Sequence, residues 1–177
     1  MVKIRRLATE AEAKALASAF RLRILRACLD ESLTNQEIAN RLGANPATTL
    51  HHVRTLVATG FLAPGPPRRG RRGSREIPYR ATGKSWELRV DDTAPTNEAM
   101  INAFLEEYQF VEDKRRVWMC RLAARLTDAE YEELNHRINA IFEELAARPP
   151  SPDGRPYSFF YAAHPDHVRE VTPPAAS

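Results

Sequence analysis

The sequence predicts a mainly α-helical fold in which three helices and a β-hairpin precede a long helical hairpin. Three observations support this fold class. Thr9, Thr34 and Thr127 are each followed three residues later by a Glu, and such pairs form capping boxes that open helices. A loop rich in Pro, Gly and Arg separates two short runs that are typical of β-strands. Apolar residues then recur at helical spacing through much of the second half.

The first helical segment begins at Thr9 and continues through Leu29, as one helix or as two helices broken near Ser18. Its apolar residues recur at steps of three and four, which places them on one face. We expect this face to be buried and Cys28 to lie in the core. The residues of the face are Leu16, Phe20, Leu22, Ile24, Leu25, Cys28 and Leu29.

Two shorter helices follow, joined by a tight turn. Thr34 caps the first, and Gly43 ends it because glycine tolerates the left-handed backbone that follows many helices. Asn45 caps the second, Pro46 occupies its first position, where no backbone donor is needed, and Gly60 ends it. Its inward side should be Thr49, Val53, Leu56 and Val57. Its outward side should be Ala47, Thr48, Leu50, His51 and Arg54, which carries no acidic residue.

A β-hairpin is expected after this helix. Residues 61–63 and 77–81 have the composition and alternation of two strands, and the loop 64–76 joins them. The arginines of that loop must be solvated or must contact an anion. Three helices followed by such a hairpin make a winged helix-turn-helix, with the hairpin as the wing. The arginines concerned are Arg68, Arg69, Arg71, Arg72 and Arg75.

The second half is predicted to be helical. After a linker at 91–96, an amphipathic pattern continues to Leu126, and Thr127 opens a further helix. Residues 148–155 interrupt helix, and 157–162 have the composition of a short strand. We therefore expect a winged-helix domain at 1–89 and a helical dimerisation domain, with a possible effector site, at 90–177. The expected dimer contacts are Ile101, Phe104, Leu105, Tyr108, Trp118, Leu122, Ile138 and Phe142.

Charge is divided unevenly along the chain. Residues 1–89 contain 17 Lys and Arg against 7 Asp and Glu, a net charge of +10, whereas residues 90–177 contain 9 against 16, a net charge of −7; together these give the overall +3. A basic half joined to an acidic half suggests that the first meets a polyanion. Two cysteines, no apolar run long enough to cross a bilayer and no signal-peptide core at the start favour a cytoplasmic protein without membrane contact.

Three motifs with fixed spacing carry a family resemblance. They are RLRIL at 21–25, QEIANRLG at 36–43, and HHVRTL at 51–56 with GFL at 60–62. Over roughly residues 9–82 the chain resembles the ArsR-type winged helix-turn-helix transcriptional repressors, to which a helical C-terminal extension is added. The resemblance implies a homodimer that binds a palindromic operator in double-stranded DNA and represses until a signal weakens the complex.

The resemblance also implies roles for individual residues. The helix at 46–59 would enter the major groove, and the wing at 64–80 would contact the minor groove and phosphates. Leu50 stands where the family usually has a small hydroxyl, so it would contact a thymine methyl instead. His52 could pack beneath the wing or lie near phosphate. The predicted DNA-binding residues are Asn45, Pro46, Thr48, Leu50, His51, His52, Arg54, Arg68, Arg69, Arg71, Arg72 and Arg75.

Several functional classes are disfavoured by the residues. The arsenic and antimony sensors of the family carry a Cys-x-Cys pair where this chain has Thr34 and Gln36, so a soft-metal site there is excluded. Neither a nucleophile with its base nor a Gly-rich phosphate loop is evident, and we predict no enzymatic activity, no metal and no cofactor. Two alternatives stay open: a winged-helix module that binds a protein partner, and a sensor with an unknown small-molecule effector between the C-terminal helices.

Overall fold

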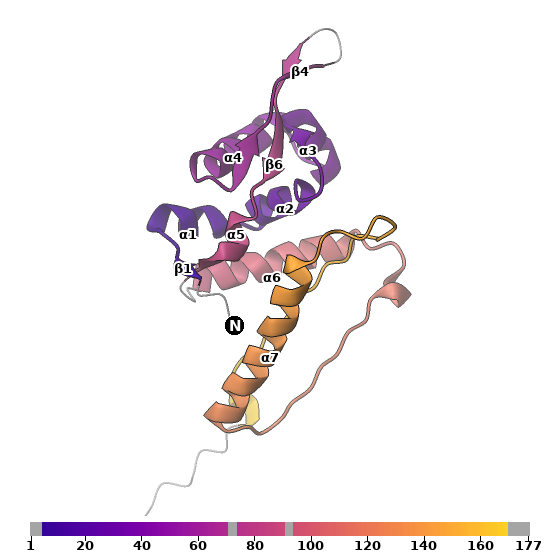
Figure 1. The fold of residues 1–177 in the computed structure, drawn as a ribbon. Coiled ribbons are helices and arrows are strands. Elements are labelled where there is room, and N and C mark those ends of the chain that lie inside the picture. The colour runs from indigo at the N-terminus through magenta and orange to yellow at the C-terminus, as the bar shows by residue number, and fades with distance from the viewer. Residues whose placement is uncertain (1–4, 71–73, 91–93, 170–177) are drawn as a thin grey trace, which may run out of the picture. The chain divides into compact units, whose positions relative to one another are not determined.

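The computed structural model describes residues 5–70, 74–90 and 94–169 (Figure 1). These residues form two compact units, of which the first ends at Glu112 and the second begins at Asp113. The mainly α-helical fold class is confirmed, with a winged helix-turn-helix followed by further helices. The first unit extends past the boundary expected at residue 89. The functional division into 1–89 and 90–177 stays a prediction.

Helices α1 (Glu10–Leu16) and α2 (Ala19–Ala27) form in place of one long helix. The predicted capping box at Thr9 is present. The Ser18 hydroxyl then accepts a hydrogen bond from the Arg21 amide and caps α2. A side chain that satisfies the free amides of a new helix explains why the chain breaks at this position.

Helices α3 (Asn35–Leu42) and α4 (Pro46–Ala58) form the predicted helix-turn-helix. Thr34 opens α3 with the expected capping box, and Gly43 follows it in the left-handed conformation, at φ 63°. Asn45 caps α4 by accepting from a backbone amide of its first turn. Each of these boundaries agrees with the signals in the sequence.

A three-stranded antiparallel sheet completes the winged helix. Its order is β2 (Leu33–Thr34), β6 (Pro78–Ala81) and β3 (Leu62–Pro64). The pairing of β3 with β6 confirms the predicted hairpin, whereas β2 was not predicted. Strands β4 (Arg68–Arg69) and β5 (Arg75–Glu76) extend the hairpin outward as the wing.

A short helix and a two-stranded parallel sheet follow the wing in the first unit. Helix α5 (Lys84–Glu87) follows the sheet, and β7 (Leu88–Arg89) pairs in parallel with β1 (Arg6–Leu7). The segment that precedes α1 is therefore joined to the segment that follows the wing.

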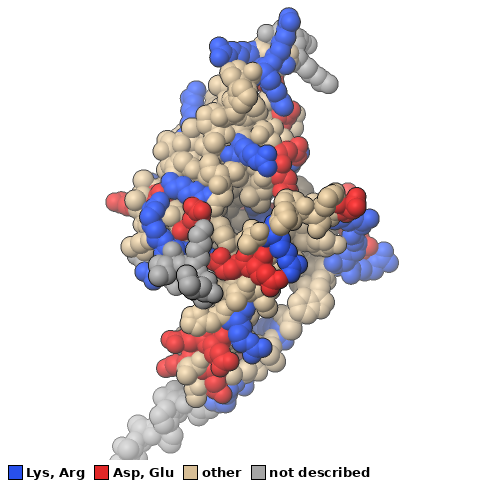
Figure 2. Space-filling view, viewed as in Figure 1, with Lys and Arg blue, Asp and Glu red and all other residues tan. Residues whose placement is uncertain are grey.

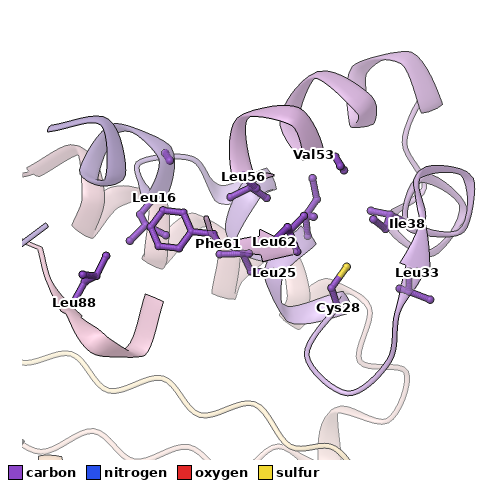
Figure 3. Packing of buried hydrophobic residues seen from close by; sticks show 12 residues of the cluster. Leu16, Leu25, Cys28, Leu33, Ile38, Val53, Leu56, Phe61, Leu62 and Leu88 are labelled. Carbon is purple, nitrogen blue, oxygen red and sulfur yellow. The ribbon is translucent and has the colours of Figure 1, made fainter. Parts of the chain in front are cut away.

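One hydrophobic core lies between these helices and the sheet (Figure 3). Leu56 from α4, Ile38 from α3 and Phe61 at the start of the hairpin are buried within it. Cys28 is buried as expected, and burial raises the pKa of its thiol to about 11. Strands β3 and β6 and helix α4 therefore pack on the same core, whereas β4 and β5 contribute no residue to it.

Helix α6 (Ala94–Gln109) packs on α2 and belongs to the first unit. Arg23 of α2 donates to Glu106 of α6 at 2.6 Å, and the two helices share a second ion pair. The helix expected to continue to Leu126 ends at Gln109, followed by the single 3-10 turn η2 (Lys114–Arg116), and residues 117–126 have no helical structure. The expectation of a continuous helix to Leu126 was therefore wrong.

The second unit contains helix α7 (Asp128–Ala147), which opens at the predicted Thr127 capping box, and the 3-10 turn η3 (His167–Arg169). The strand expected at 157–162 is absent, because no neighbouring strand pairs with this segment within the part of the chain that is described. Instead the Phe159 ring lies 6.4 Å from that of Phe142 in α7. None of the described side chains from Asp113 onward is buried. Among the described helices of the two units, none has the length and apolar character to cross a bilayer.

Candidate nucleic-acid interface

Three hydrogen bonds fix the turn between α3 and α4. The Asn35 side-chain amide donates to the carbonyl of Pro46 at 2.9 Å, which joins the first residues of the two helices. The buried Thr49 hydroxyl donates to the Asn45 carbonyl at 2.9 Å, and the Ala44 amide donates to the carbonyl of Ala39 at the same distance. These contacts hold the start of α4 in a single orientation relative to α3.

The outward side of α4 is an exposed surface of small, polar and basic groups. Thr48, His51 and Arg54 are exposed, as the sequence predicted, while Leu50 is half-buried. No acidic residue occurs in α4. Asn45 is exposed and Pro46 is half-buried at the entry of the helix. Short polar side chains and one cation on a rigid helix suit contact with base edges and phosphates.

His52 does not lie on the exposed outward side of α4. It is half-buried, its ring packs edge-on against Phe20 at 5.0 Å between centroids, and its Nδ1 is 3.4 Å from Arg21 Nη1. Burial lowers the pKa of His52, and the charge of Arg21 lowers it further. His52 therefore packs against α2, whereas the sequence had left open a place beneath the wing or near phosphate.

The pKa of His52 predicts a dependence of stability on pH. A histidine whose pKa is lowered by folding does not reduce stability at neutral pH, where it is uncharged in both states. As the pH falls below about 6.5, the unfolded state takes up the proton first because its histidine has the higher pKa, and the folded state loses stability relative to it. We expect the free energy of unfolding to decrease from pH 7 to pH 5, and to decrease less in His52→Gln. Urea titrations at several pH values measure this, with the exposed His51→Gln as the control. An equal pH dependence in all three proteins would contradict the packing of His52.

The wing presents its arginines on a two-stranded ladder. Arg68 faces Glu76, and Arg69 faces Arg75. With Pro67 and Ser74, these arginines line a shallow hollow at the surface. Figure 2 shows Lys and Arg gathered at this end of the molecule. Arg71 and Arg72, which were also predicted to contact DNA, lie outside the described residues.

The pairing of Arg69 with Arg75 is unfavourable in the absence of an anion. Like charges directly opposite each other on an antiparallel ladder repel, and both side chains are exposed. A phosphate placed between them would convert the repulsion into two attractive contacts. The ladder therefore suits a polyanionic partner better than bulk solvent.

Arg68 is held differently from Arg69 and Arg75. Its Nη2 donates to both carboxylate oxygens of Glu37, at 2.5 and 2.6 Å, and this ties the wing to α3. Glu37 also accepts from the amide of Thr34 in the capping box, and that hydrogen bond together with Arg68 lowers its pKa. The sequence marked Glu37 as a capping residue but gave no signal of its contact with the wing.

A second network, also missed from the sequence, holds the far end of α4. Lys84 Nζ donates to the carbonyl of Thr59 at 2.5 Å and lies 2.7 Å from the Glu12 carboxylate. Glu12 also accepts from both terminal nitrogens of Arg6, and these contacts hold its pKa far below the usual range. Gly60, at φ 74°, leaves the space beside Lys84 that a side chain would fill. A cation at the end of a helix stabilises its free carbonyls.

The helix-turn-helix geometry has a counterpart in a known domain family. Residues 17–66 match the model of the IclR helix-turn-helix domain. The match lies in the N-terminal region of the chain. The matched residues include α2, α3, α4 and β3, so the IclR-type domain contains the outward side of α4 described above. The match is to the winged-helix class as expected, but to IclR and not to ArsR.

Other comparisons give weaker likenesses. Reduced HlyU from Vibrio cholerae is 21% identical, with a TM-score of 0.34, over 54% of this chain and 84% of that chain. The S. aureus MepR–DNA complex is 15% identical, with a TM-score of 0.27, over 77% of this chain and 80% of that chain. No curated protein matches the chain significantly.

Proposed function

We propose that this protein is a DNA-binding transcriptional regulator in which α4 contacts bases and the wing contacts phosphates. The acid-free outward side of α4, within an IclR-type domain, carries the proposal. His51 and Arg54 are its longest polar groups, and both are exposed. The facing arginines of the wing supply a second, independent contact with the polyanion.

Individual roles follow from position. Thr48 and His51 would contact base edges in the major groove, while Arg54 would reach phosphate. Leu50, which is only half-buried, would meet a thymine methyl. Asn45 and Pro46 would bring the first turn of α4 close to the backbone. Arg71 and Arg72 complete the proposed wing contact.

We further propose a homodimer that represses transcription from a palindromic operator, in the manner of the ArsR-type repressors that the motifs resemble. Exposed or half-buried apolar residues outside the winged helix support an interface. Ile101 and Leu105 are exposed on α6, where Phe104 and Tyr108 are half-buried. Trp118 and Leu122 are exposed in the second unit, where Ile138 and Phe142 are half-buried on α7.

Selection of bound duplexes from a random pool, followed by footprinting, tests this function. We expect a palindrome whose half-sites are centred about 34 Å apart, one helical turn, because two copies of α4 would enter successive major grooves. His51→Ala should lose about 1–3 kcal/mol of discrimination at the contacted base pair. His52→Gln is the matched control and should select the same palindrome. Recovery of no enriched sequence, or of single-stranded ligands only, would refute the proposal.

A further inference from the structure

Residues 118–126 form an extended segment (Figure 1). Each of these residues is exposed. The segment begins after Val117, whose φ and ψ of −88° and 114° are those of a strand. Trp118 is 87% exposed and Leu122 is 84% exposed. Within the described chain, no backbone hydrogen bond joins residues 118–126 to any other segment. An uncovered extended segment is a template for pairing with another strand.

The side chains of this segment alternate as in a strand with one apolar side. Alternation with a period of two sends successive side chains to opposite sides. One side then consists of Trp118, Cys120, Leu122, Ala124 and Leu126, all apolar. The other side consists of Val117, Met119, Arg121, Ala123 and Arg125, which includes both charges.

We infer that residues 118–126 pair as an antiparallel β-strand with the same residues of a second copy of this chain, with Leu122 facing Leu122. The inference rests on the proposed homodimer and assigns it a contact site. Two such strands form a self-complementary interface, as a two-fold axis requires. Their apolar sides would be covered by α7, whose Leu134 and Ile141 are exposed.

The charges select this register among its neighbours. Facing residues on antiparallel strands point to the same side, so the apolar sides coincide only when the centre falls on a residue. Centred on Leu122, the pairing places Arg121 opposite Ala123 and Arg125 opposite Met119. A centre on Arg121 would place that arginine opposite itself, and a centre on Ala123 would place Arg121 opposite Arg125. Facing like charges are destabilising, so both neighbours are disfavoured.

A second copy fits this segment better than the remainder of the same chain. The other extended segment of the unit, at 157–161, already lies on α7 through Phe159 and through Tyr161, whose hydroxyl donates to Asn135 at 3.2 Å. The favourable register pairs residues 118–126 with the same residues, so only a second copy of this segment can form it. A two-stranded pair with one apolar side also requires a helix to cover it, and α7 is adjacent in the sequence.

Disulfide cross-linking of the full-length protein without DNA tests the register. In Leu122→Cys with Cys120→Ser, the two introduced thiols would face each other at about 4.5–5.5 Å between Cα atoms, which a disulfide can span. Ala124→Cys with native Cys120 should also cross-link, because residue 124 faces residue 120 of the second copy. Ala124→Cys with Cys120→Ser should not, because its two thiols are displaced by four residues, about 13 Å along the strands. Cys28 is buried and does not interfere.

We expect mild oxidation to convert most chains of the first two variants, and few of the third, to covalent dimers on a non-reducing gel. Equal cross-linking in all three would overturn the register, and none in any would overturn the pairing. Light scattering gives a second measurement: Leu122→Arg should yield a monomer, since it places two arginines face to face, while Leu122→Ile should remain dimeric. A dimeric Leu122→Arg would also overturn the pairing. DNA binding by α4 is measured separately, so failure here leaves the proposed function standing.

Discussion

Replacing Arg69 and Arg75 with alanine is expected to weaken binding to every duplex and to flatten its salt dependence. Arg69 and Arg75 face each other on the ladder, and the proposed phosphate between them would remove their repulsion. Each phosphate that is no longer neutralised lowers the slope of log K against log salt by about 0.9, so the double variant, which loses one phosphate in each subunit, should lose about 2 from the slope of a dimer. Binding titrations between low and moderate salt measure this slope.

The same substitution should not destabilise the free protein. The substitution removes two exposed positive charges that repel each other, so the midpoint of thermal unfolding should stay the same or rise. Arg89→Ala is the matched control, since Arg89 is an exposed arginine of β7, away from the wing ladder. An unchanged slope in the Arg69 and Arg75 variant, or an equal change in the control, would show that the wing does not contact DNA.

Leu56→Ala should have the largest effect on stability. Leu56 belongs to the inward side of α4 and is fully buried in the core. Truncation of such a leucine costs about 2–5 kcal/mol, because it removes apolar contacts and leaves a cavity. Urea unfolding followed by far-ultraviolet circular dichroism measures this loss.

Leu50→Ala provides the control within the same helix. Leu50 is half-buried on the outward side, so we expect a smaller loss of stability but a weaker preference for a thymine in the operator. The substitution of Leu56 should therefore act mainly on stability, and that of Leu50 mainly on DNA recognition. Equal losses of stability from both substitutions would mean that the two sides of α4 are wrongly assigned.

Local signals predicted the winged helix because each of its boundaries depends on a few adjacent residues. The Thr34 capping box, the left-handed Gly43 and the Asn45 cap with Pro46 form within their own turns. The outward side of α4 followed from helical periodicity once those boundaries were placed.

The segment at 117–126 was predicted to be helical because of an ambiguity in its spacing. Trp118, Leu122 and Leu126 are four residues apart, which matches one turn of a helix and also two repeats of a strand. The residues between them decide the matter, since Cys120 and Ala124 continue the apolar side only at a period of two. The arginines at 121 and 125 would also lie on one side in either structure, so they did not resolve it.

Contacts between distant segments could not be predicted from the sequence. Arg68 pairs with Glu37, and Lys84 joins Glu12 to the end of α4, over separations that no local pattern specifies. Arg68, Arg69 and Arg75 lie on the hairpin as predicted, but only tertiary packing distinguishes Arg68, which is bound to α3, from Arg69 and Arg75, which face each other.

In the proposed homodimer, the ion pairs between α2 and α6 would affect the spacing between the two DNA-binding domains. Arg23 with Glu106 and Arg26 with Glu107 fasten α6 to the helix that supports the DNA-binding core. If two copies associate through α6 and the segments beyond it, a rotation of α6 would also rotate the winged-helix domain that is joined to it. A signal that tilts this helix by a small angle would shift the spacing between the two copies of α4 and put them out of phase with the DNA helical repeat.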